Sequence, residues 1–134
     1  MSDWSFTLPL TVTLPRKTKK DKRVSININW YRNANYMESN SVKKAYKEII
    51  SDQFGGLRRP DGKISCRYKY YAARNNSPDL DNFIGCHKKF FQDAMVDLGF
   101  IDDDNINFIV RNSEEYCGID RENPRVEVEI FEVM

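Results

Sequence analysis

The chain has little cysteine, a single histidine and no long apolar run among its 134 residues. Because a membrane-spanning helix needs about 20 mostly apolar residues, the sequence predicts no membrane span. The N-terminus, MSDWSFTLPL, lacks the basic start and long apolar stretch of a secretory signal, so we expect a cytoplasmic protein. Cys66, Cys86 and Cys117 form no C-x-x-C pair, which fits a reducing compartment and argues against a zinc site.

The composition is that of a folded domain, with 40% hydrophobic and 31% charged residues. The length suffices for one hydrophobic core, so we expect residues 1–134 to form a single domain. Net charge is only +1, but residues 16–69 hold fifteen Lys or Arg and five Asp or Glu, whereas residues 79–134 hold five and fourteen. Such asymmetry suggests a basic surface for a polyanion and a separate carboxylate cluster that would repel it unless cations intervene.

Hydrophobic periodicity predicts the secondary structure of the first half. Residues 5–14 are expected to form an edge strand, and a second strand begins at Val24 and alternates as far as Trp30. A helix is expected from Ser39 or Ser41, either of which can cap its N-terminus, to the glycine pair at 55–56.

The second half is predicted to contain a strand from Ile64, a long helix at 80–98 and two strands at 106–110 and 126–133. Asp79 or Asp81 can cap that helix, and Cys86-His87 is expected to pack on its apolar face. This order predicts an α+β (mixed α/β) fold, with two main helices on a small mixed sheet.

Two acidic clusters flank the long helix: Asp79-Leu80-Asp81-Asn82 before it and Asp102-Asp103-Asp104-Asn105 after it. Gathered carboxylates bind hard cations such as Mg²⁺, which accept phosphate oxygens as further ligands. The alternative is that the first cluster caps the helix and the second is a solvated turn. The helix covers about 27 Å, so the clusters meet only if neighbouring strands fold the second one back.

The stretch Asp79–Asn105, DLDNFIGCHKKFFQDAMVDLGFIDDDN, resembles the signature of RusA-type Holliday junction resolvases. That signature is an Asp-x-Asp-Asn leading into a helix with a lysine, then an Asp-Ala-hydrophobic triplet, a Gly and a paired aspartate. The segments ININWYRN and VKKAYKEII are similar to phage members, so the resemblance covers most of the chain.

The resemblance implies a RusA-like endonuclease that resolves four-way DNA junctions in recombination and repair by symmetric hydrolysis of phosphodiesters. It further implies Mg²⁺ as cofactor, with Mn²⁺ as a possible substitute, and a homodimer in a bacterial or phage-infected cell. A two-fold pair of sites agrees with the two cuts that symmetric resolution needs.

Carried over residue by residue, the resemblance assigns metal binding to Asp79, Asp81 and Asp104, an assisting role to Asp103 and the family lysine to Lys89. Pairing Asp102 with Asp103 instead needs a one-residue deletion. The chain departs from the family by an insertion of about one helical turn between Asp81 and the lysine, which leaves Lys88 as an alternative.

Candidate DNA contacts are basic, with one aromatic residue, and they cluster before and after the second predicted strand. They are Arg16, Lys17, Lys19, Lys20, Lys22, Arg23, Arg32 and Tyr31, with Lys43 and Lys44 as weaker candidates. Trp30 is expected to belong to the core, whereas Tyr31 is open between core packing and stacking on DNA.

Two other functions compete with the resolvase. One is a non-catalytic DNA-binding accessory protein of recombination, whose aspartates only cap helices and turns. The other is a different structure-specific phosphodiesterase, acting on flaps or on RNA.

Overall fold

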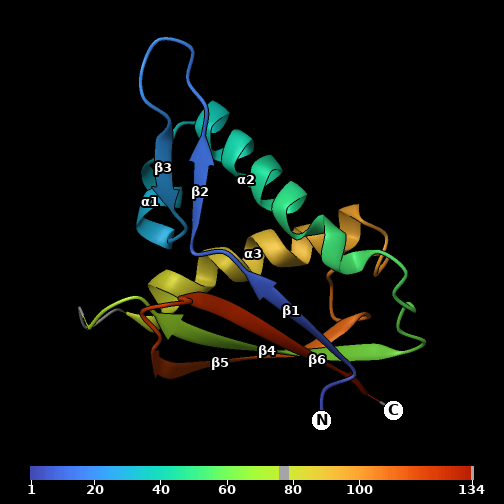
Figure 1. The fold of residues 1–134 in the computed structure, drawn as a ribbon. Helices are drawn as coiled ribbons and strands as arrows, with labels where there is room; N and C mark the ends of the chain where they lie inside the picture. Colours follow the sequence, from blue (N-terminus) through green and yellow to red (C-terminus); the bar gives the residue numbers. More distant parts are fainter. Residues whose placement is uncertain (76–78, 134) are drawn as a thin grey trace.

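The chain folds around a four-stranded sheet with the order β1-β6-β4-β5 (Figure 1). The computed structural model describes residues 1–75 and 79–133. The strands are β1 (Trp4–Leu8), β4 (Lys63–Ala72), β5 (Ile109–Ile119) and β6 (Arg125–Val133). β4 and β5 run parallel, and the other neighbours are antiparallel. The predicted α+β class with a small mixed sheet is confirmed.

The segment expected to be one edge strand is two strands in two different sheets. β1 lies at the edge of the main sheet, with Trp4, Phe6 and Leu8 buried on alternate positions. β2 (Thr11–Leu14) instead pairs with β3 (Lys22–Ser25) in a separate hairpin, which stands clear of the main sheet (Figure 1). Pro9 lies between β1 and β2, where a residue without an N–H cannot continue a strand ladder.

The strand expected to reach Trp30 ends at Ser25, and a short helix, α1 (Ile28–Asn33), takes its place. Asn27 causes the change, because its side chain accepts a hydrogen bond of 2.8 Å from the backbone N–H of Trp30. The next helix, α2 (Tyr36–Ser51), is also capped by an asparagine, Asn35, and therefore begins before the predicted Ser39. A 3₁₀ turn (Asp52–Phe54) ends it.

The long helix is confirmed as α3 (Leu80–Asp97), with Asp79 as its N-cap and Gly99, at φ 80°, just beyond its end. Figure 1 shows α2 and α3 on the same side of the main sheet. The predicted packing of Cys86-His87 on the apolar face is also confirmed, since both side chains are fully buried. Burial raises the pKa of the Cys66 and Cys86 thiols to about 12.

The strand expected at 106–110 starts at Ile109 and runs on to Ile119. Sequence periodicity missed most of it because β5 is an edge strand whose residues are largely polar and partly exposed. Its partner β4 fits the prediction closely, and β6 begins one residue before the predicted Val126. α3 therefore connects two parallel neighbours, so its N-terminus lies at the end of the sheet where β4 and β5 finish.

Candidate active site

The Asp-x-Asp-Asn motif forms the first turn of α3, and its residues have separate tasks. The carboxylate of Asp79 accepts a hydrogen bond of 3.1 Å from the backbone N–H of Asp81, which caps the helix. Asn82 accepts one of 2.9 Å from the backbone N–H of Asn29 and so fixes α1 against α3. The exposed carboxylate of Asp81 bonds to no other described side chain. Of the motif's acids, Asp81 therefore has both carboxylate oxygens free of other described side chains, whereas one oxygen of Asp79 is occupied by the cap.

A hollow of about 430 Å³ opens in front of this motif, between α1, α3 and β5. Asp81, Gly85 and Lys88 follow one another along one face of α3. A Cβ on Gly85 would lie 3.1 Å from side-chain atoms of Ile28, so the glycine lets α1 approach closely. The polar lining comes from all three elements and consists of Asn29, Arg32, Asp79, Asp81, Asn82, Lys88 and Glu114.

Lys88, rather than Lys89, faces the aspartates. Its amine donates to the carboxylate of Glu114 on β5 at 2.6 Å, and both residues line the hollow. Lys89 is exposed on the next face of α3, where its amine lies 5.9 Å from the ring centre of Tyr31. The structure therefore favours the alternative Lys88 over the predicted Lys89 as the lysine of this site.

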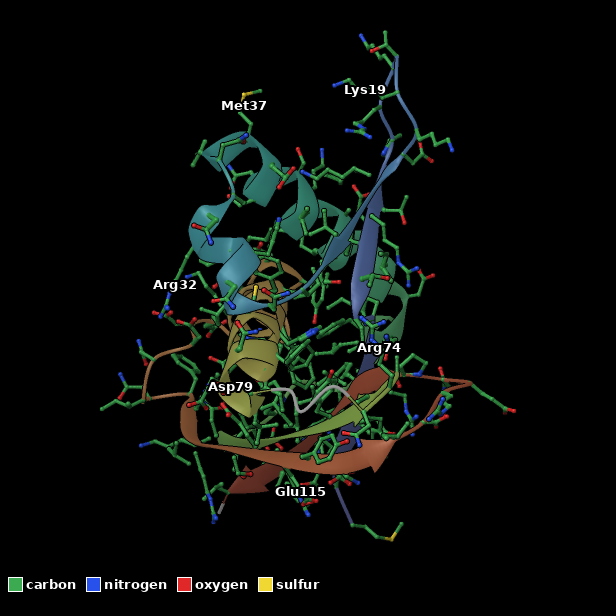
Figure 2. The ribbon with its side chains drawn as sticks, turned by 90° about the vertical axis from the view of Figure 1, so that its left-hand side faces the viewer. Lys19, Arg32, Met37, Arg74, Asp79 and Glu115 are labelled. Atoms are coloured by element: carbon green, nitrogen blue, oxygen red, sulfur yellow. The ribbon has the colours of Figure 1, made fainter. Side chains whose placement is uncertain are left out.

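The charges of the hollow are mixed, with three carboxylates and two cationic side chains within one open surface. Carboxylate and amide oxygens suit a hard divalent cation, whereas Lys88 and Arg32 suit a phosphate oxygen. Figure 2 shows Arg32 and Asp79 on the same side of the molecule. The arrangement can hold a phosphodiester and a cation side by side.

The second acidic cluster lies at the opposite end of α3 and does not join the first. Asp102 pairs with Arg59 at 2.6 Å, and Asp103 accepts bonds from the backbone N–H of Asp104 at 2.7 Å and from the Asn105 amide at 3.0 Å. The helix between the clusters is about 27 Å long. Within residues 1–75 and 79–133, no three Asp, Glu, His or Cys side chains are grouped to hold a metal ion. One chain therefore does not assemble Asp79, Asp81 and Asp104 into a shared shell.

The basic run occupies the tip of the β2–β3 hairpin. Residues 15–23 are exposed, and Figure 2 shows Lys19 at the far end of the hairpin, distant from Asp79. Arg16 bonds to the carbonyl of Lys20 at 2.7 Å, and Lys22 forms an ion pair with Glu38 that lowers the pKa of that carboxyl. The hairpin charges and the aspartates are thus presented by separate parts of the fold.

The aromatic residues near the hollow mainly pack. Trp30 and Tyr31 both meet the ring of Phe90 edge-on, with centroids 6.2 and 5.7 Å away, and Trp30 also donates to Glu38. Trp30, expected in the core, is partly buried and packs against it, and so does Tyr31. Lys43 is similarly engaged, because it pairs with Asp93 of α3 at 2.6 Å.

Sequence reasoning missed Glu114 and Arg74. Glu114 belongs to the unrecognised part of β5, where it lies beside the buried Tyr68 of β4 and so faces the helices. Arg74 follows β4 and, with Arg23, lines a separate hollow of about 930 Å³. Only the correct extent of β5 and the hairpin position could have revealed these two, since neither residue belongs to a motif.

Comparison with models of known protein families finds no match to the chain, and comparison with curated proteins finds none either. None of the helices in the described part of the chain is long and apolar enough to cross a bilayer.

Proposed function

We propose that this protein is a RusA-type endonuclease that uses Mg²⁺ to hydrolyse phosphodiesters at four-way DNA junctions. The observation that carries the proposal is the hollow at the start of α3, in which the unpartnered carboxylate of Asp81 shares a helix face with Lys88 and lies near Arg32. Asp81 and Lys88 lie in the stretch that resembles the family signature, and Arg32 lies in the segment ININWYRN, which is similar to phage members.

The donor chemistry of this hollow fits Mg²⁺. Asp79 and Asp81 supply carboxylate oxygens, and Mg²⁺ in phosphate-handling sites is commonly held by one or two carboxylates together with waters and substrate oxygens. When bound, such an ion lowers the pKa of water and stabilises charge on a leaving oxygen, and Mn²⁺ can supply the same chemistry.

The protein's own groups position the substrate. Arg32 and Lys88 bind the phosphate and offset its charge beside the aspartates. Glu114 keeps the Lys88 amine in place before substrate arrives. The exposed hairpin residues add phosphate contacts that depend on salt and read shape more than sequence, which suits an enzyme that selects branched DNA.

The active form we propose is a homodimer. Two symmetric cuts need two sites, and a two-fold axis supplies them. The separation of the acidic clusters adds a second reason, because Asp103 and Asp104 of one copy can approach Asp79 and Asp81 of the other without crossing the length of α3. Asp104 suits this role, since its carboxylate bonds to no other described side chain, whereas Asp102 is held by Arg59.

A non-catalytic DNA-binding accessory protein is the second candidate, and specific contacts favour it. Asp79 caps α3 and Asp103 closes its own turn, so both have structural tasks that need no metal. A third candidate, a phosphodiesterase for flaps or RNA, uses the same hollow and differs from the first only in its substrate.

The test is cleavage of a labelled four-way junction, a matched duplex, a flap and an RNA hairpin, each with Mg²⁺, Mn²⁺ or EDTA. We expect paired nicks in the junction alone, dependent on metal, and lost in Asp81→Asn while junction binding persists. Asp102→Asn is the matched control and should cleave like the unaltered protein. Binding without cleavage under either metal would favour the accessory protein, and preferred cleavage of flap or RNA would favour the third candidate.

A further inference from the structure

The two edges of the main sheet differ in how they are covered. At the β1 edge, the side-chain amide of Gln53 both donates to the carbonyl of Thr7, at 2.7 Å, and accepts from its N–H, at 2.8 Å. At the β5 edge, no hydrogen bond joins the outer backbone of residues 110–119 to any other described residue. An open edge of this length is a template for another strand.

Exposed apolar side chains on β5 also indicate that this edge can accept another strand. Val110, Tyr116 and Ile119 are 44, 45 and 42% exposed, which places three large apolar residues on one strand. Charged residues usually protect a sheet edge, but the carboxylates of β5 are engaged within the chain. Glu114 pairs with Lys88 at 2.6 Å and Glu115 with Arg67 at 2.7 Å.

We infer that β5 pairs antiparallel with β5 of a second copy of this chain, about a two-fold axis at Ser113. Residues opposite one another in an antiparallel pair point to the same face, so an axis at a residue makes one continuous sheet with both α3 helices on one side. In this register Arg111 lies opposite Glu115 of the second copy, whose carboxylate also pairs with Arg67 of its own chain but stays 41% exposed, and Val110 lies opposite Tyr116.

Other registers are less favourable on charge. An axis at Arg111, Glu114 or Glu115 would place that residue opposite itself, which sets like charges together. An axis at Asn112 leaves Arg111 facing the neutral Ser113. The Ser113 register alone among these five gives Arg111 an opposite charge, and no other described residue forms an ion pair with Arg111.

Pairing through β5 places one acidic cluster of each copy at the same end of the joined sheet. β5 begins near the Asp102–Asp104 turn and ends beside Ala72, at the end of the sheet that carries Asp79. Antiparallel pairing therefore brings the second copy's aspartate turn to the end where the first copy has its hollow. The interface rests on the homodimer part of the proposed function but not on its chemistry, so it can be tested without DNA or metal.

The first test is sedimentation velocity of the full chain over a range of concentrations. Arg111→Glu and Glu115→Arg should each weaken dimerisation about ten-fold or more, and the double exchange should return much of the affinity. Arg121→Glu, in the β5–β6 turn, is the charge-matched control and should dimerise normally. Circular dichroism establishes that each variant is folded. A folded monomer at all concentrations, or dimers indifferent to Arg111→Glu, overturns the inference.

The second test fixes the register by oxidative cross-linking in a Cys117→Ser background. Ser113→Cys should form an intermolecular disulfide readily, because opposed Cβ atoms of an antiparallel pair lie about 4.5–5.5 Å apart. Asn112→Cys, one residue away on the other face, should link far more slowly. Faster linking of the Asn112→Cys variant than of the Ser113→Cys variant overturns the inferred axis. A dimer that forms this interface but shows no nuclease activity would instead count against the proposed function alone.

Discussion

Lys88 and Lys89 are neighbours in the sequence with different surroundings, so replacing each in turn tests whether the hollow is the site of cleavage. We predict that Lys88→Met lowers kcat for junction cleavage by about 10- to 100-fold, because it removes a positive charge beside the reacting phosphate. Lys89→Met should change kcat less than about three-fold, since Lys89 lies outside the hollow. Steady-state kcat values of the two variants with a labelled junction test the prediction, and equal losses would count against Lys88 as the lysine of the site.

His87 makes the fold sensitive to acid. The ring is fully buried, and burial lowers its pKa to about 3. Its Nδ1 shares a hydrogen bond of 2.8 Å with the Tyr46 hydroxyl, and its Nε2 has no hydrogen-bond partner among the described residues. A pKa lower in the folded state means that the unfolded chain binds the proton more tightly, so stability falls as pH drops from about 6.5 toward about 3. We expect a loss of roughly 2–3 kcal/mol by about pH 4.5 from this residue.

Urea unfolding at several pH values measures that loss. The double variant Tyr46→Phe/His87→Leu removes the titrating group without leaving the Tyr46 hydroxyl unpaired, and its stability should fall less steeply below pH 6.5. An identical pH dependence in both proteins would show that His87 does not titrate on unfolding.

The separate tasks within the Asp-x-Asp-Asn motif explain what sequence alone could not settle. Capping and metal binding both favour aspartate at the start of a helix, so residue type does not distinguish them. The structure separates the two roles in part, because Asp79 caps α3 whereas the carboxylate of Asp81 bonds to no other described side chain. The choice between Lys88 and Lys89 likewise needed the position of β5, which supplies Glu114.

At the scale of elements, the β2–β3 hairpin presents most of the predicted DNA contacts. We predict that the triple variant Lys17→Gln/Lys19→Gln/Lys20→Gln weakens junction binding and lowers the slope of log Kd against log salt by about two to three. The reason is that each phosphate contact releases counterions from the DNA on binding, so the loss of contacts lowers the number released. Fluorescence anisotropy at several salt concentrations measures the slope.

The control for the hairpin is Lys63→Gln/Arg121→Gln, which removes two exposed positive charges, against three in the hairpin variant, at the start of β4 and in the β5–β6 turn. It should leave the salt slope nearly unaltered. A slope that falls equally in both variants would mean that binding follows net charge alone rather than the hairpin.

Helices and strands with one regularly buried face were the ones that the sequence predicted accurately. β4, α3 and β6 have one regularly buried face and were predicted nearly to the residue. The predicted β5 was too short because this exposed edge strand lacks that pattern. The start of α1, as far as Trp30, was predicted as strand because the apolar residues alternate from Val24, and the cap by Asn27 ends that strand. In both cases a local hydrogen bond or a neighbouring strand, rather than periodicity, determined the outcome.

At the scale of the whole molecule, the fold class followed from the order of elements, but the relation between the acidic clusters did not. A helix of about 27 Å separates them, and the sequence left open whether strands fold the second cluster back. The parallel neighbours β4 and β5 keep the clusters at opposite ends of the sheet. The proposed shared site therefore depends on a second copy of the chain.

Mixing two inactive variants, Asp81→Asn and Asp104→Asn, tests this central claim most directly. If Asp79 and Asp81 of one copy act with Asp104 of the other, mixed dimers contain one intact site. A statistical mixture then has about a quarter of its sites intact, so we predict partial recovery of junction nicking, with single rather than paired cuts. If Asp81 and Asp104 acted within one copy, neither site of a mixed dimer would be intact, and cleavage would stay as low as in each variant alone.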